Sequence, residues 1–551
     1  MTAISLATPA FRPGRLMALV GLLGLVVLLQ IELVFSKSVN WDEFFHFSRI
    51  HQQLLDRPID WLQVPYIYLY SWVPSLPGDS ITHIQIIRFL ILPFELATIA
   101  AIVAAARQFA SRESAVLCGL VYVTGGYVFS QGFALRADMI ACAFLTVALW
   151  ISLSKPLRPS VLILVTLLLG LAFLSTIKSV LWAPAFLGAA LYRLEKPRQR
   201  WTVVAATATI GIAGTLFLLA APWLPQSGLG GRLHDIGELG RASIDRMFVA
   251  ELFPLGGYLL KQALMAPILT VTILMTLWLN FARDRDAKER LLALCLLAPL
   301  LTVAIYRNAF PYHFGFILPP AIIAAAPAIE LLSRRYGALT LGLLLLLNAV
   351  ILSLVEDRNV LPRQRAVQNG IHQIFSAPVA YIDNSGMASE FPRVRNHFAS
   401  GWGLEVYREA GIPVYSQEMR IETVPLLITN VVSLQNVFYD TGVDAHLLPQ
   451  DARTLRENYV PHWGYVYVAG KQIREGSSPL MIEISVPGTY TVEGGPISLE
   501  GKTYLPGDTL LLKRGPIRVT QGRNHPVTLR WGDHLPRPSF PWPEERLFTD
   551  Y

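Results

Sequence analysis

Residues 38–49 read SVNWDEFFHFSR and follow directly on a long apolar run, Leu16–Phe35. About 20 apolar residues are enough for a helix to cross a bilayer. Carboxylates beside such a span are costly to place there and tend to be functional. We therefore expect the chain to build a site around Asp42 and Glu43. These neighbours point about 100° apart on a helix, so only one can face a given site. The alternative is that Asp42 caps the following helix, since Asp is a favoured N-cap.

The composition of the 551 residues indicates a membrane protein. Hydrophobic residues make up 53% and charged residues 15%, whereas soluble proteins carry about 25% charged residues. Three cysteines inside apolar runs suggest neither a disulfide framework nor a metal site. The apolar runs predict eleven transmembrane helices, with these bounds: Leu16–Phe35, Thr82–Ala106, Ser114–Ser130, Met139–Leu153, Ser160–Leu174, Val180–Leu191, Val203–Ala221, Gly257–Phe281, Leu291–Tyr306, Phe314–Leu332 and Ala338–Leu354.

Basic residues recur in alternate loops, from Arg12 and Arg15 to Arg334 and Arg335. By the positive-inside rule, the N-terminus is expected in the cytoplasm and the chain in the cell inner (plasma) membrane. The first run is too long for a signal peptide and lacks a small-residue cleavage site, so we expect it to remain as a span. The formal charge of +7 is explained by these loops, and no nucleic-acid binding is expected.

The predicted membrane domain covers residues 1–355, with outer loops at 36–81 and 222–256. Helical spacing of apolar residues after Phe44 predicts an amphipathic helix lying at the membrane surface. An odd number of spans exports residues 356–551 as a soluble periplasmic domain. Its part 356–471 mixes helix and strand patterns, and 478–540 alternates like a small β-sandwich. Trp463, Tyr465 and Tyr467 are candidate rings for stacking on a carbohydrate, although a structural role for this domain is favoured.

Three more outer turns carry charged or hydrogen-bonding side chains beside apolar spans. A lysine at such a place suits a phosphate as a point charge. Snorkelling of the long cations is the alternative, but it does not explain a short carboxylate at a span's end. An interfacial aromatic belt is the alternative for the rings. The residues concerned are Arg136, Asp138, Lys178, Arg307, Tyr312 and His313.

These motifs together resemble the C-type (GT-C) glycosyltransferases, most closely the protein O-mannosyltransferase and aminoarabinose (lipid A) transferase group. The resemblance covers about residues 16–330. The matching residues are Asp42-Glu43, Val64–Tyr68, Arg88, Leu135–Asp138, Thr176–Lys178 and Tyr312–Phe314 before Leu318-Pro319.

The resemblance implies a glycosyltransferase that moves a sugar from a polyprenyl-phosphate donor to a lipid, protein or polysaccharide acceptor on the non-cytoplasmic face. It implies that Asp42 is the base or an essential residue of the acceptor site, with Glu43 beside it. Asp138 is a third candidate, which could orient the acceptor, hold Arg136 or assist as a second carboxylate. The donor phosphate would be held by Lys178, Arg307, Arg136, Tyr312 and His313, and the other substrate-site candidates are His46, Arg49, Tyr66 and Arg88. One base opposite one leaving group would invert the anomeric carbon. The chain departs from the family at His313, where many relatives have tyrosine, and in lacking a glycine after Lys178.

Two other classes of function fit the composition. A lipid-linked-sugar flippase should carry ionisable groups near mid-span and show repeated halves, whereas the charges here gather at the outer ends of spans. A non-catalytic membrane protein of envelope assembly is the second. An enzyme that transfers a phospho-group is a further alternative, but that chemistry usually recruits a metal, and the outer turns show no clear carboxylate cage with the spacing that Mg²⁺ takes. The sequence indicates no cofactor with certainty and leaves a dependence on a divalent metal open.

Overall fold

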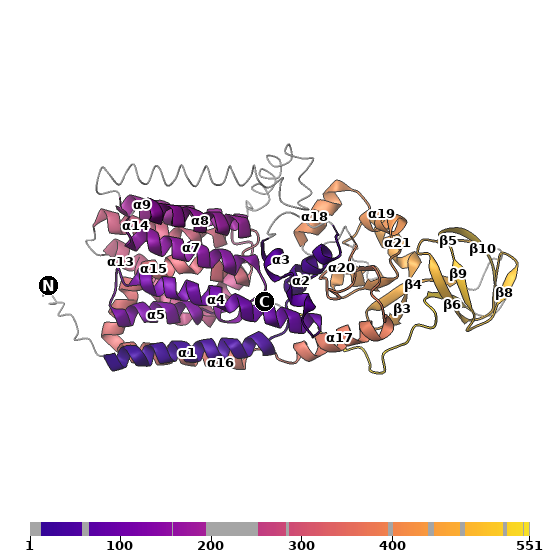
Figure 1. Cartoon of the computed structure of the whole chain (residues 1–551), viewed down its shortest axis with the longest axis horizontal. Helices are drawn as coiled ribbons and strands as arrows, with labels where there is room; N and C mark the ends of the chain where they lie inside the picture. The colour runs from indigo at the N-terminus through magenta and orange to yellow at the C-terminus, as the bar shows by residue number, and fades with distance from the viewer. Residues whose placement is uncertain are drawn as a thin grey trace.

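The computed structural model describes residues 13–57, 65–156, 158–193, 252–282, 286–394, 401–438, 446–473, 480–521, 526–543 and 545–549. Long helices form a bundle at one end of the molecule (Figure 1). The C-terminal region, from residue 356 onward, forms the other end and contains short helices and two β-sheets (Figure 1). The helix that carries Asp42 lies where the two parts meet.

Long apolar helices make up the bundle. Among the described residues, four are long and apolar enough to cross a membrane, namely α1, α4, α7 and α15, and a bent pair makes a fifth. Each predicted apolar run falls on helices of the bundle whose bounds follow, except Val203–Ala221, which lies outside the described residues. The total of eleven spans stays a prediction. The bundle comprises α1 (Pro13–Ser36), α4 (Ser80–Ala106), α5 (Arg112–Val123), α6 (Tyr127–Gln131), α7 (Ala137–Ser154), α8 (Pro159–Ser175), η2 (Ile177–Trp182), α9 (Ala183–Arg193), α12 (Gly256–Met265), α13 (Pro267–Ala282), α14 (Ala287–Leu297), η5 (Ala298–Ala304), α15 (Pro311–Tyr336) and α16 (Ala338–Leu354).

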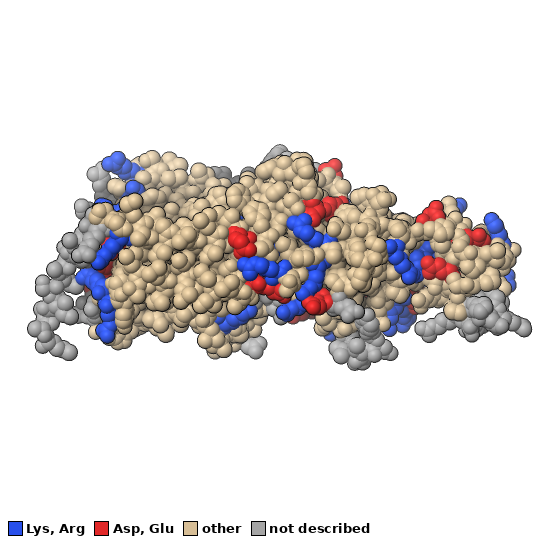
Figure 2. Space-filling view, turned by 90° about the horizontal axis from the view of Figure 1, so that it is seen from below, with Lys and Arg blue, Asp and Glu red and all other residues tan. Residues whose placement is uncertain are grey.

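The side of the bundle is almost free of charge over the face that Figure 2 shows. Lys and Arg gather at the end far from the C-terminal region, and both signs of charge appear at the junction between the two parts (Figure 2). An apolar belt between two charged ends is what a lipid bilayer requires of a helical bundle. This is the architecture of an integral membrane protein.

Two predicted straight spans are broken in the structure. The run Gly257–Phe281 forms α12 and α13, which meet at 103°, because Pro267 disfavours helical geometry at the preceding residue. The run Ser114–Ser130 breaks at Gly126, whose φ of +61° suits glycine. Gln262 of α12 satisfies the broken backbone, accepting from the Tyr127 N–H (2.9 Å) and donating to the carbonyl of residue 125 (2.8 Å).

The helix α2 (Trp41–Leu54) follows α1 and is succeeded by α3 (Pro65–Tyr70) and η1 (Val73–Ser75). Its apolar residues Phe44, Phe47 and Ile50 are fully buried in a cluster that also contains residues of α4 and the C-terminal region. The prediction of a helix lying on the membrane surface is therefore wrong for Phe44, Phe47 and Ile50, whereas Leu54 and Leu55 at the end of this face are exposed. Protein, rather than lipid, covers the three buried side chains.

The C-terminal region builds two packed sheets. Strands β1 and β2 pair in parallel and all other pairs are antiparallel. One sheet has the order β1-β2-β4-β11-β6-β9, with β3 on β4, and the other β5-β10-β7-β8. The elements are α17 (Val360–Ile374), β1 (Tyr381–Ile382), α18 (Gly401–Ala410), α19 (Val414–Ile421), β2 (Leu426–Ile428), α20 (Val432–Gln435), α21 (Pro449–Asn458), β3 (Tyr459–Trp463), β4 (Val466–Ile473), β5 (Leu480–Ile484), β6 (Gly488–Gly494), β7 (Ile497–Leu499), β8 (Lys502–Tyr504), β9 (Thr509–Leu512), β10 (Gly515–Gln521) and β11 (Val527–Trp531).

Apolar side chains from both sheets share one core, with Leu499 and Val519 of one sheet and Val492 and Leu529 of the other buried together. Sheets that bury their facing sides in this way form a sandwich. Strand β4 runs across the predicted boundary near residue 471 and pairs with β2 and β11. The division into domains at 355 and 471 stays a prediction.

The last described residues, Leu547 to Thr549, return to the bundle. The Thr549 hydroxyl lies 3.3 Å from that of Ser38, at the entry to α2. Gln364 of α17 donates to the Leu547 carbonyl (2.8 Å) and to the Val39 carbonyl (2.7 Å). The loop that leads into α2 is thus held from both the bundle and the C-terminal region.

Candidate functional site

The start of α2 is fixed by a capping box. The Asn40 side chain accepts from the Asp42 N–H (3.1 Å), and the Glu43 carboxylate accepts from the Asn40 N–H (3.0 Å). This arrangement satisfies backbone donors that the first helical turn would otherwise leave open. Asn40 is therefore the N-cap, and the interpretation of Asp42 as the cap is wrong. Asp42 is left to point its carboxylate elsewhere.

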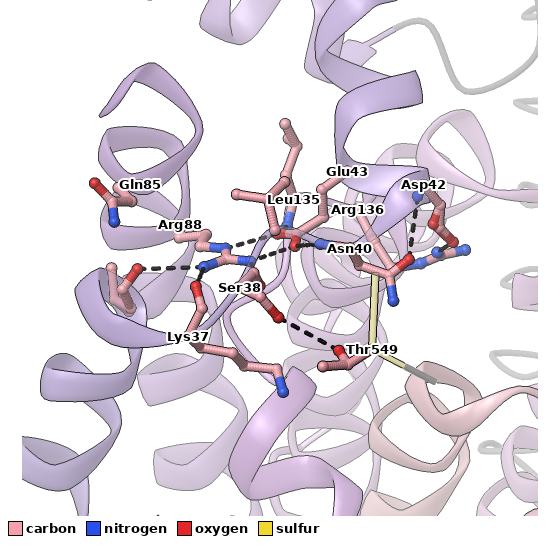
Figure 3. A network of polar contacts seen from close by, with 12 residues as sticks. Lys37, Ser38, Asn40, Asp42, Glu43, Gln85, Arg88, Leu135, Arg136 and Thr549 are labelled. Atoms are coloured by element: carbon pink, nitrogen blue, oxygen red, sulfur yellow. Dashed lines mark hydrogen bonds and ion pairs between the residues drawn. The ribbon is translucent and has the colours of Figure 1, made fainter. Parts of the chain in front are cut away.

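Glu43 and Arg88 form a buried ion pair at the centre of Figure 3. Glu43 is 2% exposed and Arg88 1%. Arg88 also donates to the carbonyls of Lys37 (2.9 Å) and Ser38 (2.8 Å), while Glu43 accepts from the Leu135 N–H (2.9 Å). Burial alone would raise the pKa of Glu43, but the charge of Arg88 holds that pKa below its usual value. The pair joins the end of α1, the start of α2, α4 and the loop before α7.

Asp42 belongs to a second group of charges, which we call the Asp42 cluster: Asp42, Arg136, Asp138 and Lys178. Asp42 forms an ion pair with Arg136, whose Nε lies 3.2 Å from Asp138. Lys178 Nζ lies 3.0 and 3.1 Å from the two oxygens of Asp138. All four side chains are buried. The sequence analysis placed them in three separate outer turns, and the structure brings them together.

The Tyr312 ring forms one wall of the Asp42 cluster. The Arg136 guanidinium carbon lies 3.2 Å from its centroid and Lys178 Nζ 4.8 Å. Aromatic faces attract cations, and more strongly where water is absent. Tyr312 comes from the first turn of α15, so the cluster is built from α2, α7, α15 and the turn before α9. Two cations meet there beside a ring, and the two carboxylates Asp42 and Asp138 pair with them.

The face of α2 that carries Asp42 continues with His46 and Arg49, four and seven residues further on. His46 Nδ1 lies 2.8 Å from the Tyr66 hydroxyl, and Arg49 Nη1 lies 3.5 Å from the same oxygen. Burial, and then the charge of Arg49, lower the pKa of His46 to about 3. His46 is therefore neutral at physiological pH. Three of the predicted substrate-site residues lie together on this face.

Two other residues predicted at the donor phosphate make contacts outside the Asp42 cluster. Arg307 forms an ion pair with Glu405 of α18, in the C-terminal region. His313 is buried, with Nε2 3.1 Å from the Thr302 hydroxyl and its ring 4.8 Å from that of Tyr306. Their roles toward the donor remain predictions. Within the described residues, no group of three or more His, Cys, Asp or Glu is placed to hold a metal ion.

The rings proposed for carbohydrate stacking are largely part of the C-terminal core. Trp463 is buried, with its ring 4.9 Å from that of Trp542, and the buried Tyr467 stacks on Phe438 at 4.1 Å. Only Tyr465 is half-buried. Occupied faces favour the structural role for these rings.

Two of the buried charged residues that the sequence motifs did not identify are Glu95 and Arg393. Glu95 accepts from Gln30 (3.0 Å) within the bundle, and a lone carboxylate inside an apolar helix could have identified it. Arg393 places its guanidinium carbon 5.1 Å from the Phe45 ring of α2. No sequence pattern connects two residues so far apart in the chain, so only the fold reveals this contact.

No protein-family model and no curated protein sequence matches the chain. Among solved structures it is similar to ArnT from Cupriavidus metallidurans bound to undecaprenyl phosphate, with 12% identity and a TM-score of 0.55. The match covers 82% of this chain and 97% of ArnT. The apo form of ArnT gives 13% identity and the same TM-score and coverage.

An oligosaccharyltransferase from Archaeoglobus fulgidus in the apo form matches with 12% identity and a TM-score of 0.48, over 95% of this chain and 98% of that one. At such identities the likeness to ArnT shows a shared fold. The predicted resemblance to the GT-C enzymes is confirmed at that level.

Proposed function

We propose that this chain is an integral membrane glycosyltransferase that transfers a sugar from a polyprenyl-phosphate donor to an envelope acceptor, which is a lipid, a protein or a glycan. The observation that carries the proposal is the buried Asp42 cluster, where two cations and an aromatic ring face a carboxylate at the start of α2. ArnT, which shares the fold, was solved with undecaprenyl phosphate, and this supports a donor of that class.

The cations of the cluster suit the leaving group. When the bond between the sugar and the phosphate breaks, its electron pair goes to the phosphate, whose negative charge grows from one to two. Lys178 and Arg136 would stabilise that charge in a site without bulk water, where such contacts are strongest. In the present structure Asp42 and Asp138 together balance the charge of the two cations. A donor phosphate would replace part of that pairing.

Asp42 would act as the base. A phosphate that draws Arg136 toward itself weakens the Asp42–Arg136 ion pair and leaves the Asp42 carboxylate to accept a proton. The acceptor hydroxyl gives that proton to Asp42, its oxygen bonds to the anomeric carbon, and the phosphate leaves from the opposite face with inversion. Positioned bases contribute about 10²- to 10⁴-fold to such rates.

The remaining predicted residues would position the reacting groups. Glu43 has both oxygens bound to protein donors, so we assign it the placement of α2 and the loop before α7 rather than chemistry. Asp138 would hold Arg136 and Lys178 in place. His46 and Arg49 lie on α2 beyond Asp42, beside Tyr66 of α3, and these three residues would line the path of the acceptor.

The proposed site lies at the end of the bundle nearest the C-terminal region. The basic residues at the other end (Figure 2) favour a cytoplasmic location for that end by the positive-inside rule. The transfer would then take place on the non-cytoplasmic face of the cell inner membrane, with the C-terminal region in the periplasm.

The flippase alternative would draw support from a broken helix with charged groups around the break. The helix is broken at the bend between α12 and α13. The described residues that line the cavity beside this bend, however, carry no charge. They are Val121, Thr124, Ala266, Ile268, Leu269, Leu345 and Asn348. The charges gather instead around Asp42.

The test is an in vitro assay of the purified full-length protein in nanodiscs. Several polyprenyl-phosphate sugars are offered together with extracted envelope lipids, glycans and proteins, and the acceptors are analysed by mass spectrometry. We expect sugar transfer by the wild type and a loss of at least 10²-fold in Asp42→Asn, which still binds undecaprenyl phosphate. Movement of the lipid-linked sugar across vesicles without transfer would establish the flippase instead. Near-normal turnover by Asp42→Asn would remove Asp42 from the role of base.

A further inference from the structure

A buried arginine of the C-terminal region faces the helix that carries Asp42. Arg393 is 1% exposed, and its guanidinium carbon lies 5.1 Å from the centroid of the Phe45 ring. The guanidinium carbon of Arg49 lies 5.9 Å from the same centroid. Two buried guanidinium groups, one from α2 and one from the C-terminal region, therefore lie around a single ring.

The hydrogen-bonding groups of Arg393 are incompletely used. Among the described residues, its buried Nε and Nη1 have no hydrogen-bond partner. The nearby buried carboxylate of Asp383 acts on Arg393 through its charge, while its oxygens accept from the backbone N–H groups of Gly386 and Met387, both at 2.8 Å. A buried charged donor that makes no hydrogen bond is costly to the folded state. Burial accordingly lowers the pKa of Arg393. A cation retained at such a cost has donors available for an anion.

The backbone around Arg393 makes room for the guanidinium against α2. Gly386 has a φ of +77°, which favours glycine. A Cβ atom at Gly386 would collide with Arg393 Nη1 and would lie 2.6 Å from Ser48 Oγ. The loop that holds Asp383 therefore requires a glycine where it approaches both the guanidinium and α2.

The position of Arg49 and Arg393 relative to Asp42 indicates which substrate they would contact. Arg49 follows Asp42 by seven residues on the same face of α2, which corresponds to about 10 Å along the helix axis. Lys178 and Arg136 contact Asp138 and Tyr312, on the bundle side of Asp42. The two arginines thus lie beyond Asp42 from the proposed donor phosphate, toward the C-terminal region.

We propose that Arg393 and Arg49 form a subsite for an oxyanion, a phosphate or carboxylate group of the acceptor. The subsite holds that group while the acceptor's hydroxyl lies at Asp42. This inference rests on the proposed function and adds to it an anionic acceptor and a substrate-binding residue from the C-terminal region. Arginine suits the task because its planar fork matches the two oxygens of such groups.

The test measures anion binding by thermal unfolding of the full-length protein in nanodiscs of phosphatidylcholine. Inorganic phosphate is titrated at constant ionic strength, with and without undecaprenyl phosphate occupying the donor site. A second arm replaces inorganic phosphate by phosphatidic acid in the nanodiscs, which distinguishes a soluble anion from a lipid headgroup. The variant is Arg393→Met, and the matched control is Arg518→Met, at an exposed arginine of β10.

We expect either probe to stabilise the wild type and Arg518→Met, and the affinity of Arg393→Met to be weaker by on the order of 10- to 100-fold. Without a ligand, Arg393→Met should unfold at a lower temperature than the wild type, because the buried Asp383 loses the positive charge beside it, and Arg393→Lys should recover part of that loss. A purely structural arginine would give the lower unfolding temperature without the loss of affinity.

Equal protection of the wild type and Arg393→Met by both probes, or protection of neither protein, overturns the subsite. Should Arg393→Met fail to fold, Arg393→Lys keeps the charge without the fork, and unchanged phosphate affinity in that variant also overturns it. Failure of the proposed function is distinguishable, because it would appear as the absence of undecaprenyl phosphate binding in every variant, including the wild type.

Discussion

Asp42 and Glu43 are neighbours in the chain and both are buried carboxylates paired with arginine, yet their surroundings differ. Glu43 and Arg88 bind each other and the backbone at the entries to α2 and α7. Asp42 shares Arg136 with Asp138, which in turn contacts Lys178. In the first group, Glu43 and Arg88 find their hydrogen-bond partners in each other and in the backbone. The second group holds two cations, although Asp42 forms an ion pair with only one of them.

The difference shows that two adjacent residues in one helical turn can have different roles, Glu43 in positioning the chain and Asp42 in the proposed reaction. Residues 100° apart on a helix face different neighbours, and the capping box turns Glu43 back toward the chain entry. Glu43 then positions Leu135, next to Arg136, through its contact with the Leu135 N–H. The supporting carboxylate thus places the cation that pairs with the proposed base.

Exchanging each carboxylate for its amide should give the largest difference between Asp42 and Glu43. Glu43→Gln leaves Arg88 buried without its counter-ion, and removing one partner of such a pair costs about 3–5 kcal/mol. Asp42→Asn should cost less, because Arg136 keeps Asp138. Thermal unfolding in nanodiscs measures both. Equal losses of stability in the two variants would mean that the carboxylates do not have separate roles.

A second substitution sharpens the role of the Asp42 cluster. Lys178→Gln removes a cation that contacts Asp138 at 3.0 Å, and we expect undecaprenyl phosphate to bind on the order of 10- to 100-fold more weakly, since hydrogen bonds to charged groups contribute about 1.5–3 kcal/mol. Lys155→Gln, at the far end of α7, is the control. Unchanged donor binding in a stable Lys178→Gln protein would favour the snorkelling interpretation of this lysine.

Much of the site was predictable because its residues violate the rules for membrane spans. Asp138 and Lys178 are charges at the ends of apolar runs, and each is costly enough there to indicate a task. The alternation of apolar and polar residues likewise predicted strands in the C-terminal region, and strands are present there. These signals are local, so one chain segment at a time reveals them.

Contacts between distant segments were not predictable. The pairing of Glu43 with Arg88 and the approach of Arg393 to Phe45 join residues far apart in sequence, through packing that no periodicity encodes. Burial of α2 was misjudged for the same reason. Its apolar face suits lipid and protein equally well, and only the position of the C-terminal region decides between them.

The face of α2 beyond Asp42 can be tested through His46. Its pKa in the folded protein, about 3, lies below the value of about 6.5 in unfolded chains. Its contribution to stability is therefore complete above pH 6.5 and is lost as the pH falls toward 3, by at most about 1.4 kcal/mol per pH unit. We expect thermal stability between pH 6.5 and 4.5 to fall less steeply in His46→Gln. Parallel curves for the two proteins would show that water reaches this face.

The smallest expected effect concerns Arg307, whose partner lies outside the Asp42 cluster. The ion pair with Glu405 is partly exposed, and such pairs contribute about 0–1 kcal/mol. Arg307→Gln should therefore change stability by less than about 1 kcal/mol and leave undecaprenyl phosphate affinity within a few-fold of the wild type, as should Glu405→Gln. Lipid-binding titrations of both variants decide. A tenfold loss in Arg307→Gln alone would return Arg307 to the donor phosphate and enlarge the cationic site around Asp42.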